Sequence, residues 1–263
     1  MSTRLLVLGS SIASGLGARG RPFPRLLAEA LGDPPLLDLS KSGRMIDESL
    51  ALTAEIAAFA PTLAVLQHGG AESVVHPGPF VDRLINRFAP SSWHGVAGLQ
   101  PRAYYSRDPH RRRGQRRTSR LKVAIKRVAI PMSRGRPRMT SETFAVQLVE
   151  LIAMLHGLGC DVVVLGVHPR DERLFPRSQA VADRLDAVIR RIAETDPRIV
   201  FVDLVATLRC WEDYLEDRLH WNTDGHIRVT AAIVAAVTPL LHARDERNLT
   251  SADRHVRAAD RSS

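Results

Sequence analysis

Short runs of apolar residues alternate along the chain with longer segments whose apolar residues recur at helical spacing. The apolar runs occupy residues 4–9, 36–39, 63–67, 162–166 and 199–202. The helical segments occupy residues 23–31, 46–59, 142–155, 178–195 and 225–242. This alternation predicts a parallel β-sheet with helices on both faces, and unbroken apolar runs are typical of strands that are covered on both sides. We therefore expect an α/β protein with a five-stranded parallel sheet.

The pattern is lost between residues 77 and 139, after the third strand. From Arg102 to Arg138 the chain holds 14 Lys and Arg against one acid, Asp108. That segment has a net charge of +13. The whole chain has a net charge of +9, so the remaining residues have a net charge of −4. We expect a basic insertion with helices near residues 80–88 and 119–128 and a poorly ordered middle. Residues 1–243 otherwise form one domain, and residues 244–263, which lack apolar anchors, are expected to be a flexible tail.

The composition argues against membrane-spanning, secreted, disulfide-rich and metal-binding proteins. No segment reaches the roughly 18 apolar residues of a membrane span, and the N-terminus lacks the apolar core of a signal peptide, so we expect a cytoplasmic protein. The two cysteines, Cys160 and Cys210, indicate neither a disulfide framework nor a metal-binding pair. The spacing of His68, His76 and His94 fits no usual metal site. We therefore expect no metal and no cofactor.

Two polar segments fall where a parallel sheet keeps its sites. Ser11 follows the first strand and precedes a segment that reads as helix, so its hydroxyl would lie near unpaired N–H groups that can hold an oxyanion. A simple helix-capping serine is the alternative. Asp217 and His220 lie in a loop before the last helix. A carboxylate beside an imidazole is what a general base for a serine requires, although a polar surface loop gives the same pattern.

These segments occur in the order found in a known family. The chain resembles the SGNH/GDSL hydrolases over residues 4–75 and 141–241, leaving the insertion out. The matching residues are Gly9 and Ser11, Gly43, Gly69, Asp217-x-x-His220-x-Asn222, and Gly225-His226. The resemblance implies a three-layer, flavodoxin-like α/β/α sandwich and an esterase, lipase or acyltransferase. It implies Ser11 as the nucleophile, His220 as the base and Asp217 as the acid that orients it.

Two positions depart from the family pattern. Ser10 stands where the family has Asp, and Ala71 stands where it has an Asn that donates to the oxyanion, together with the N–H groups of Ser11 and Gly43. Losing one such donor typically lowers kcat by ~10²–10³. We expect a slow triad unless Gln67, His68 or a residue of the insertion replaces the donor.

Two other functions stay open. A non-catalytic module could keep the fold and bind an anionic ligand through the insertion, although retention of all three triad residues favours an enzyme. An NAD site at Gly15, Gly17 and Gly20, with Asp38 as the ribose partner, would leave Ser10–Ser11 and the 217–220 loop unexplained.

The substrate is expected to be a small ester, such as an O-acetylated sugar by family habit, with water or a hydroxyl as acceptor. His68, Gly69 and His168 are the expected substrate contacts, since each follows a strand. The arginine stretch has three open interpretations: a solvated loop, capture of an anionic substrate or carrier, or contact with nucleic acid or an anionic membrane. The chain carries no RNA- or DNA-binding motif, which disfavours nucleic acid. Nothing in the sequence indicates an oligomeric state.

Overall fold

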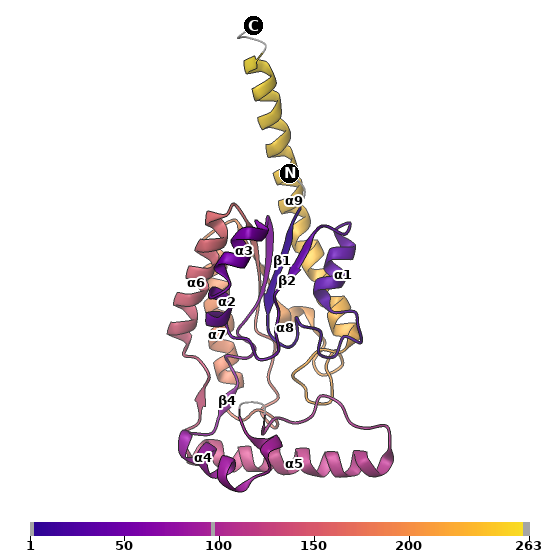
Figure 1. Ribbon diagram of the computed structural model, residues 1–263, viewed down its shortest axis with the longest axis vertical. Helices are drawn as coiled ribbons and strands as arrows, with labels where there is room; N and C mark the ends of the chain where they lie inside the picture. Colours follow the sequence, from indigo (N-terminus) through magenta and orange to yellow (C-terminus); the bar gives the residue numbers. More distant parts are fainter. Residues whose placement is uncertain (1–2, 96–97, 260–263) are drawn as a thin grey trace.

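The computed structural model describes residues 3–95 and 98–259 and contains the expected parallel sheet (Figure 1). Its order is β2-β1-β3-β6-β7. The strands span Leu36–Asp38, Leu5–Gly9, Leu63–Gln67, Asp161–Leu165 and Ile199–Val202 in that order. All four pairings are parallel. The carboxyl ends of the strands therefore share one edge, which is where parallel sheets keep their sites.

Helices cover both faces of the sheet, as predicted. One face, built on Leu6 and Leu66, packs against α2 (Ile46–Leu50), α3 (Thr53–Phe59), α6 (Ser141–Gly157) and α7 (Gln179–Glu194). The other face, built on Val7 and Val65, packs against α1 (Phe23–Ala30), α8 (Leu204–Thr207) and α9 (Thr223–Ala259). Successive strand residues point to opposite faces, so strands buried on both sides must be apolar throughout. The three-layer α/β/α sandwich inferred from the sequence is confirmed.

The last helix, α9, extends beyond its expected end at His242 to Ala259. Residues 243–259 include neither glycine nor proline and are rich in Ala and Arg, which have high helix propensity. Among the described residues, only the part from Thr223 to His242 is long and apolar enough to cross a membrane. Its Val229, Ile233 and Val237 are fully buried against the sheet layer, so one side of this segment packs into the core.

The insertion forms a lobe beneath the carboxyl edge of the sheet (Figure 1). It contains α4 (Pro79–Phe88), a 3₁₀ turn (Ser91–Trp93) and α5 (Pro109–Met132). Antiparallel pairing of β4 (Val75–His76) with β5 (Arg136–Pro137) joins its two ends. The short helix at residues 80–88 agrees with the sequence-based expectation.

The expectation of a poorly ordered middle is wrong, because the arginine run is part of the 24-residue helix α5. Asp108 caps this helix by accepting the Arg111 N–H at 2.8 Å, and proline fills the first helical position. Arg112 and Arg116 then reach Glu216 at 3.6 and 3.3 Å. Arginine is a good helix former, so the cap and this distant acid are sufficient to order the run.

The segment after Ser11 also differs from expectation. It forms a series of turns over residues 11–17 instead of a helix, and α1 begins at Phe23, where the sequence predicts it. Gly15 and Gly17 adopt φ of +88° and +107°, which end any helical course. A Cβ on Gly17 would lie 2.1 Å from the Trp221 carbonyl oxygen. The glycine thus lets the chain after β1 run directly against the loop that carries His220.

Candidate active site

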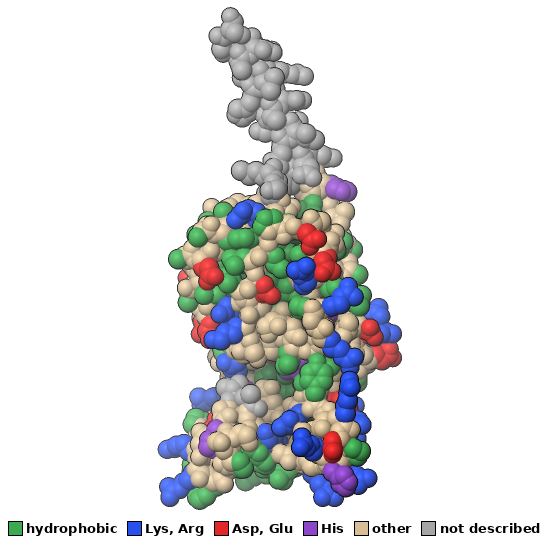
Figure 2. Space-filling model, turned by 45° about the vertical axis from the view of Figure 1, so that its right-hand side comes forward, with side chains coloured by type: hydrophobic (Ala, Val, Ile, Leu, Met, Phe, Trp, Pro, Cys, Tyr) green, Lys and Arg blue, Asp and Glu red, His purple; other side chains and the backbone are tan. Residues whose placement is uncertain are grey.

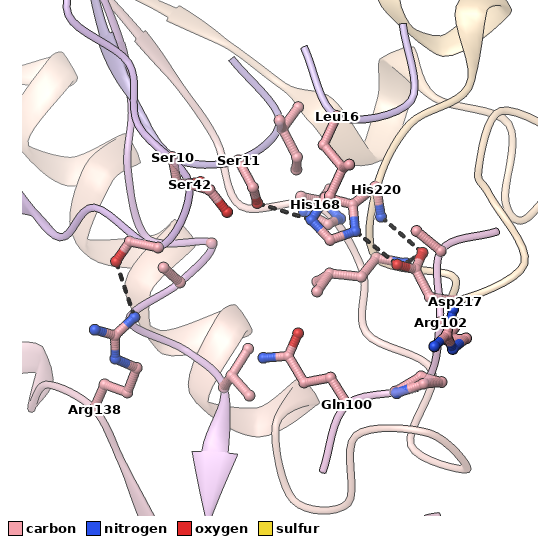
Figure 3. Close-up of a pocket in the computed structure, with 18 of the residues that line it drawn as sticks. Ser10, Ser11, Leu16, Ser42, Gln100, Arg102, Arg138, His168, Asp217 and His220 are labelled. Carbon is pink, nitrogen blue, oxygen red and sulfur yellow. Dashed lines mark hydrogen bonds and ion pairs between the residues drawn. The ribbon is translucent and has the colours of Figure 1, made fainter. Parts of the chain in front are cut away.

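Ser11, His220 and Asp217 come together at the carboxyl edge of the sheet (Figure 3). Ser11 Oγ lies 2.8 Å from His220 Nε2, and His220 Nδ1 lies 2.6 Å from Asp217 Oδ2. The other Asp217 oxygen accepts the backbone N–H of Leu219 and of His220 at 3.0 and 3.1 Å. The backbone thus orients the carboxylate, and the carboxylate favours the tautomer with the proton on Nδ1. His220 Nε2 is then free to take the Ser11 proton.

The rest of the 213–226 loop explains why its motif has these residue types. Asn222 caps α9 by accepting the Gly225 N–H at 3.0 Å, and its amide donates to the Glu212 carbonyl at 2.7 Å. A Cβ on Gly225 would lie 2.5 Å from the Asp213 carbonyl oxygen. Both residues fix the loop against the start of α9, and with it the position of His220.

A cavity of about 480 Å³ lies in front of the Ser11 hydroxyl. The ends of β1, β2 and β3 supply part of its wall, including Ser42, Gly43, Gly70 and Ala71. The insertion supplies another part: Gln100, Pro101, Arg102, Ala103, Lys122 and Arg138. The insertion is therefore a wall of the cavity and not a loop that only borders it.

The predicted oxyanion residues Ser11, Gly43 and Ala71 all line this cavity. Among the hydrogen bonds of the described residues, none uses the N–H of Ser11 or of Gly43. Ala71 presents only a methyl group. The side-chain amide of Gln100 extends from the insertion into the same cavity (Figure 3). This polar group could not be assigned from the sequence, because Gln100 reaches the site only through the path of the insertion.

Ser10 does not replace the charge of the family Asp. Its N–H and its hydroxyl both donate to Gln67 Oε1 at 3.1 Å, and its side chain is buried. This pair of bonds ties the end of β1 to the end of β3. Gln67 is thereby engaged in holding the Ser10–Ser11 turn and does not line the cavity.

The structure does not place His68 and Gly69 at the cavity, contrary to our expectation. His68 is buried, with Nε2 at 3.1 Å from Ser49 Oγ. Gly69 packs so closely that a Cβ there would lie 2.6 Å from Val167 Cγ2. His68 and Gly69 therefore pack inside the protein after the end of β3. The next two residues, Gly70 and Ala71, line the cavity.

His168 does line the cavity, as expected. Arg170 Nη1 donates to its Nε2 at 2.8 Å. Burial, followed by the charges of Arg170 and His220, holds the pKa of His168 well below its usual value. His168 is therefore a neutral wall of the site at neutral pH.

Two buried charged residues that sequence reasoning missed hold the loop carrying Ala71. Arg170 donates to the Gly70 carbonyl at 2.7 Å and to Ser73 Oγ at 3.0 Å, and burial lowers its pKa to about 10. Glu72 accepts the N–H of Ile46 and of Gly69 at 3.0 and 2.8 Å. Glu72 follows Ala71, where the family has Asp, and that position was the only available signal for it.

The cavity wall is positively charged. Arg102, Lys122 and Arg138 line it, and within the described part of the chain none of the three is in an ion pair with a carboxylate. Burial, together with the charge of Arg102, lowers the pKa of Lys122. Arg138 donates to the Gly43 carbonyl at 3.1 Å. Asp217, already engaged by His220, is the one acid among the described lining residues.

Solved structures with this fold include TesA, with 18% sequence identity, a TM-score of 0.57, and coverage of 90% of this chain and 99% of that chain. An α/β hydrolase from the metagenome of Lake Arreo, Spain, has 16% identity, a TM-score of 0.55, and coverage of 89% and 94%. An acetylxylan esterase from Geobacillus stearothermophilus has 15% identity, a TM-score of 0.54, and coverage of 90% and 94%. At these identities the likeness shows the fold alone.

Comparison with curated proteins found no match. The family model described as the GDSL-like Lipase/Acylhydrolase family matches residues 7–228, which is most of the chain and spans both Ser11 and His220. The sequence blocks, the sheet order and this match agree, and the chain belongs to the GDSL-like lipase/acylhydrolase family.

Proposed function

We propose that the protein is a serine acyl-ester hydrolase that works through Ser11, His220 and Asp217. The observation that carries the proposal is the continuous chain of contacts from Ser11 Oγ through His220 to Asp217, at 2.8 and 2.6 Å, opening on the cavity. Ser11 Oγ attacks the acyl carbon while His220 Nε2 takes its proton. His220 then gives that proton to the leaving alkoxide oxygen as the tetrahedral intermediate collapses to an acyl-enzyme and the alcohol departs. Water then repeats the sequence and releases the acid.

The oxyanion in this proposal is held by the N–H groups of Ser11 and Gly43 and by the side-chain amide of Gln100. Gln100 lines the cavity and its side-chain amide extends into it, whereas Gln67 and His68 do not line it. A side-chain amide from the insertion would then take the place of the amide that Ala71 lacks. Preorganised donors of this kind supply much of the rate of acyl transfer.

The substrate in this proposal carries a negative charge apart from the ester. Arg102, Lys122 and Arg138 line the cavity, where a carboxylate or phosphate on the substrate would pair with them. One of the structural neighbours is an acetylxylan esterase by its name. An O-acetylated acidic saccharide combines an acetyl ester with such a charge. Transfer to an acceptor hydroxyl would use the same acyl-enzyme, and product analysis distinguishes the two outcomes.

The test is turnover of a short-chain aryl ester by wild type and by Ser11→Ala, with thermal melts to confirm folding. The variant should lose turnover because, among the described residues, Ser11 is the hydroxyl that contacts His220. Ser92→Ala, which removes an exposed hydroxyl from the 3₁₀ turn of the insertion, is the matched control and should retain activity. Full activity in Ser11→Ala contradicts the proposal. A folded wild type without turnover of neutral or anionic esters would favour a non-catalytic binding module.

A further inference from the structure

The two helices of the insertion expose large apolar side chains. Along α4, Phe80, Leu84 and Phe88 recur every fourth position and are 65%, 42% and 76% exposed. Along α5, Leu121, Val128 and Met132 are 54%, 60% and 79% exposed. These six residues define what we call the outer face. A soluble protein rarely gathers this much exposed apolar surface in one place without a partner.

The outer face of α5 points away from the rest of the protein. Spacings of seven and four residues put Leu121, Val128 and Met132 on one side of the helix. Lys126 and Ile130, two residues offset from these, are fully buried on the opposite side. Lys126 Nζ donates to the Leu174 carbonyl at 3.0 Å and lies 4.4 Å from the centre of the Phe175 ring. The inner side therefore fixes α5 to the body, and the outer side leaves Leu121, Val128 and Met132 largely exposed.

A shallow groove lies between α4 and α5. It has a volume of about 500 Å³ and an almost wholly apolar wall formed by Val81, Ala124, Ile125, Val128, Ala129 and Met132. Val81 is the α4 residue of this wall, and Val128 and Met132 are shared by the groove and the α5 stripe. Figure 2 shows apolar side chains at the lower end of the molecule, bordered by Lys and Arg side chains. The outer face thus lies beside an apolar groove and has a basic border.

Arginines of α5 lie on the same side of the helix as its exposed apolar residues. Arg113 and Arg117 precede Leu121 at four-residue intervals, so one side of α5 reads basic in its first half and apolar in its second. Arg120 and Arg127 flank that side and are exposed. The arginines could pair with the phosphates of a nucleic acid, but a nucleic acid backbone offers no apolar surface to the exposed Phe, Leu and Met side chains. An anionic lipid surface is complementary to both, because apolar side chains enter the acyl boundary and arginines stay at the headgroups.

We infer that the outer face docks this protein onto a bilayer rich in anionic lipids. The inference does not depend on the proposed hydrolase activity. The inner side of the same helix contributes Lys122 to the cavity wall. Docking would therefore hold the cavity close to the lipid surface, where an ester at the interface could reach it.

The test is flotation of the full chain with large unilamellar vesicles of phosphatidylcholine alone or with 30 mol% phosphatidylglycerol. Binding is expected with the anionic vesicles, weak with the neutral ones, and lower at high salt. Arg113→Gln with Arg117→Gln should weaken partitioning by about fivefold for each cation removed. Phe80→Ser with Phe88→Ser and Met132→Ser should weaken it by at least about tenfold at any salt concentration, because burial of apolar area is lost.

The matched control is Val146→Ser with Val149→Ser, which removes exposed valines from α6 on the body. It should leave vesicle binding unchanged. Ser11→Ala should also bind vesicles, so failure of the catalytic proposal would not be mistaken for failure of this one. Equal binding to both vesicle types, no binding, or wild-type binding by the outer-face variants would overturn the inference. Binding of duplex DNA through the arginines without vesicle binding would replace it with a nucleic-acid surface.

Discussion

Replacing Gln100 with alanine tests the part of the site that departs most from the family pattern. Gln100 comes from the insertion and projects its amide into the cavity that Ser11 and His220 face (Figure 3). If this amide serves the oxyanion, Gln100→Ala leaves only the N–H groups of Ser11 and Gly43. The Ser11–His220–Asp217 contacts lie on other elements and stay in place. We therefore predict a fall in kcat with little change in KM.

The size of the fall follows from the number of donors. Removing one oxyanion donor typically lowers kcat by ~10²–10³, or about 3–4 kcal/mol of transition-state stabilisation. Ala71 lines the same cavity, so Ala71→Asn offers a replacement amide from the family position. In the Gln100→Ala background, Ala71→Asn should restore much of kcat. In wild type it should have little effect, because the donor is already present.

The assay is steady-state hydrolysis of a 4-nitrophenyl ester by wild type, both single variants and the double variant. Gln147→Ala on α6, away from the cavity, controls for loss of a glutamine side chain. The reasoning is refuted if Gln100→Ala keeps kcat within about threefold of wild type while Ala71→Asn alone raises it ten- to a hundredfold. That result would mean that the site works without a third donor.

Three further predictions concern other parts of the molecule. Burial lowers the pKa of His226 to about 4, so between pH 6.5 and 4 the unfolded chain binds a proton at this residue that the folded chain does not. As the pH falls through that window, wild type should lose about 3 kcal/mol more of its free energy of unfolding than His226→Asn, measured by denaturant titration. The asparagine keeps an acceptor for the Phe23 N–H without the titration. Gly69→Ala should lower the melting temperature, because its φ is +89° and its Cβ would clash with Val167; a melting temperature equal to that of wild type would contradict this packing. Lys122→Gln should lower the ratio of kcat/KM for anionic 4-nitrophenyl hemiglutarate to kcat/KM for neutral 4-nitrophenyl valerate by about tenfold or more. The reason is that hydrogen bonds to charged groups are worth roughly 1.5–3 kcal/mol. An unchanged ratio would show that Lys122 does not recognise the substrate.

The sheet could be predicted from the sequence because its determinants are local. The strands at residues 63–67 and 199–202 coincide with β3 and β7, since double-sided burial demands continuous apolar runs. Asp217 and His220 could be found for a similar reason. His220 follows Asp217 by three positions in one loop, and this short separation places the carboxylate against the imidazole. Backbone N–H groups of the same loop orient the carboxylate.

The features that escaped prediction depend on contacts between distant segments. The order of α5 rests partly on Glu216, a hundred residues after Arg116. Gln100 reaches the cavity because β4 and β5 join the ends of the insertion beneath the sheet. His68 looked like a substrate contact because it follows a strand, but its ring bonds Ser49 on α2. Sequence patterns report which residues end a strand and do not report which way the next turn directs them.

The most direct test of the central claim is covalent labelling with a fluorophosphonate, followed by intact-mass and peptide mass spectrometry. We predict one phosphonyl adduct per chain, located on Ser11, because among the described serines it is Ser11 whose Oγ lies 2.8 Å from His220 Nε2. Ser11→Ala should take no label and His220→Ala should take it far more slowly. A folded wild-type protein that stays unlabelled, or that carries the label on another serine, would contradict the assignment of Ser11 as the nucleophile.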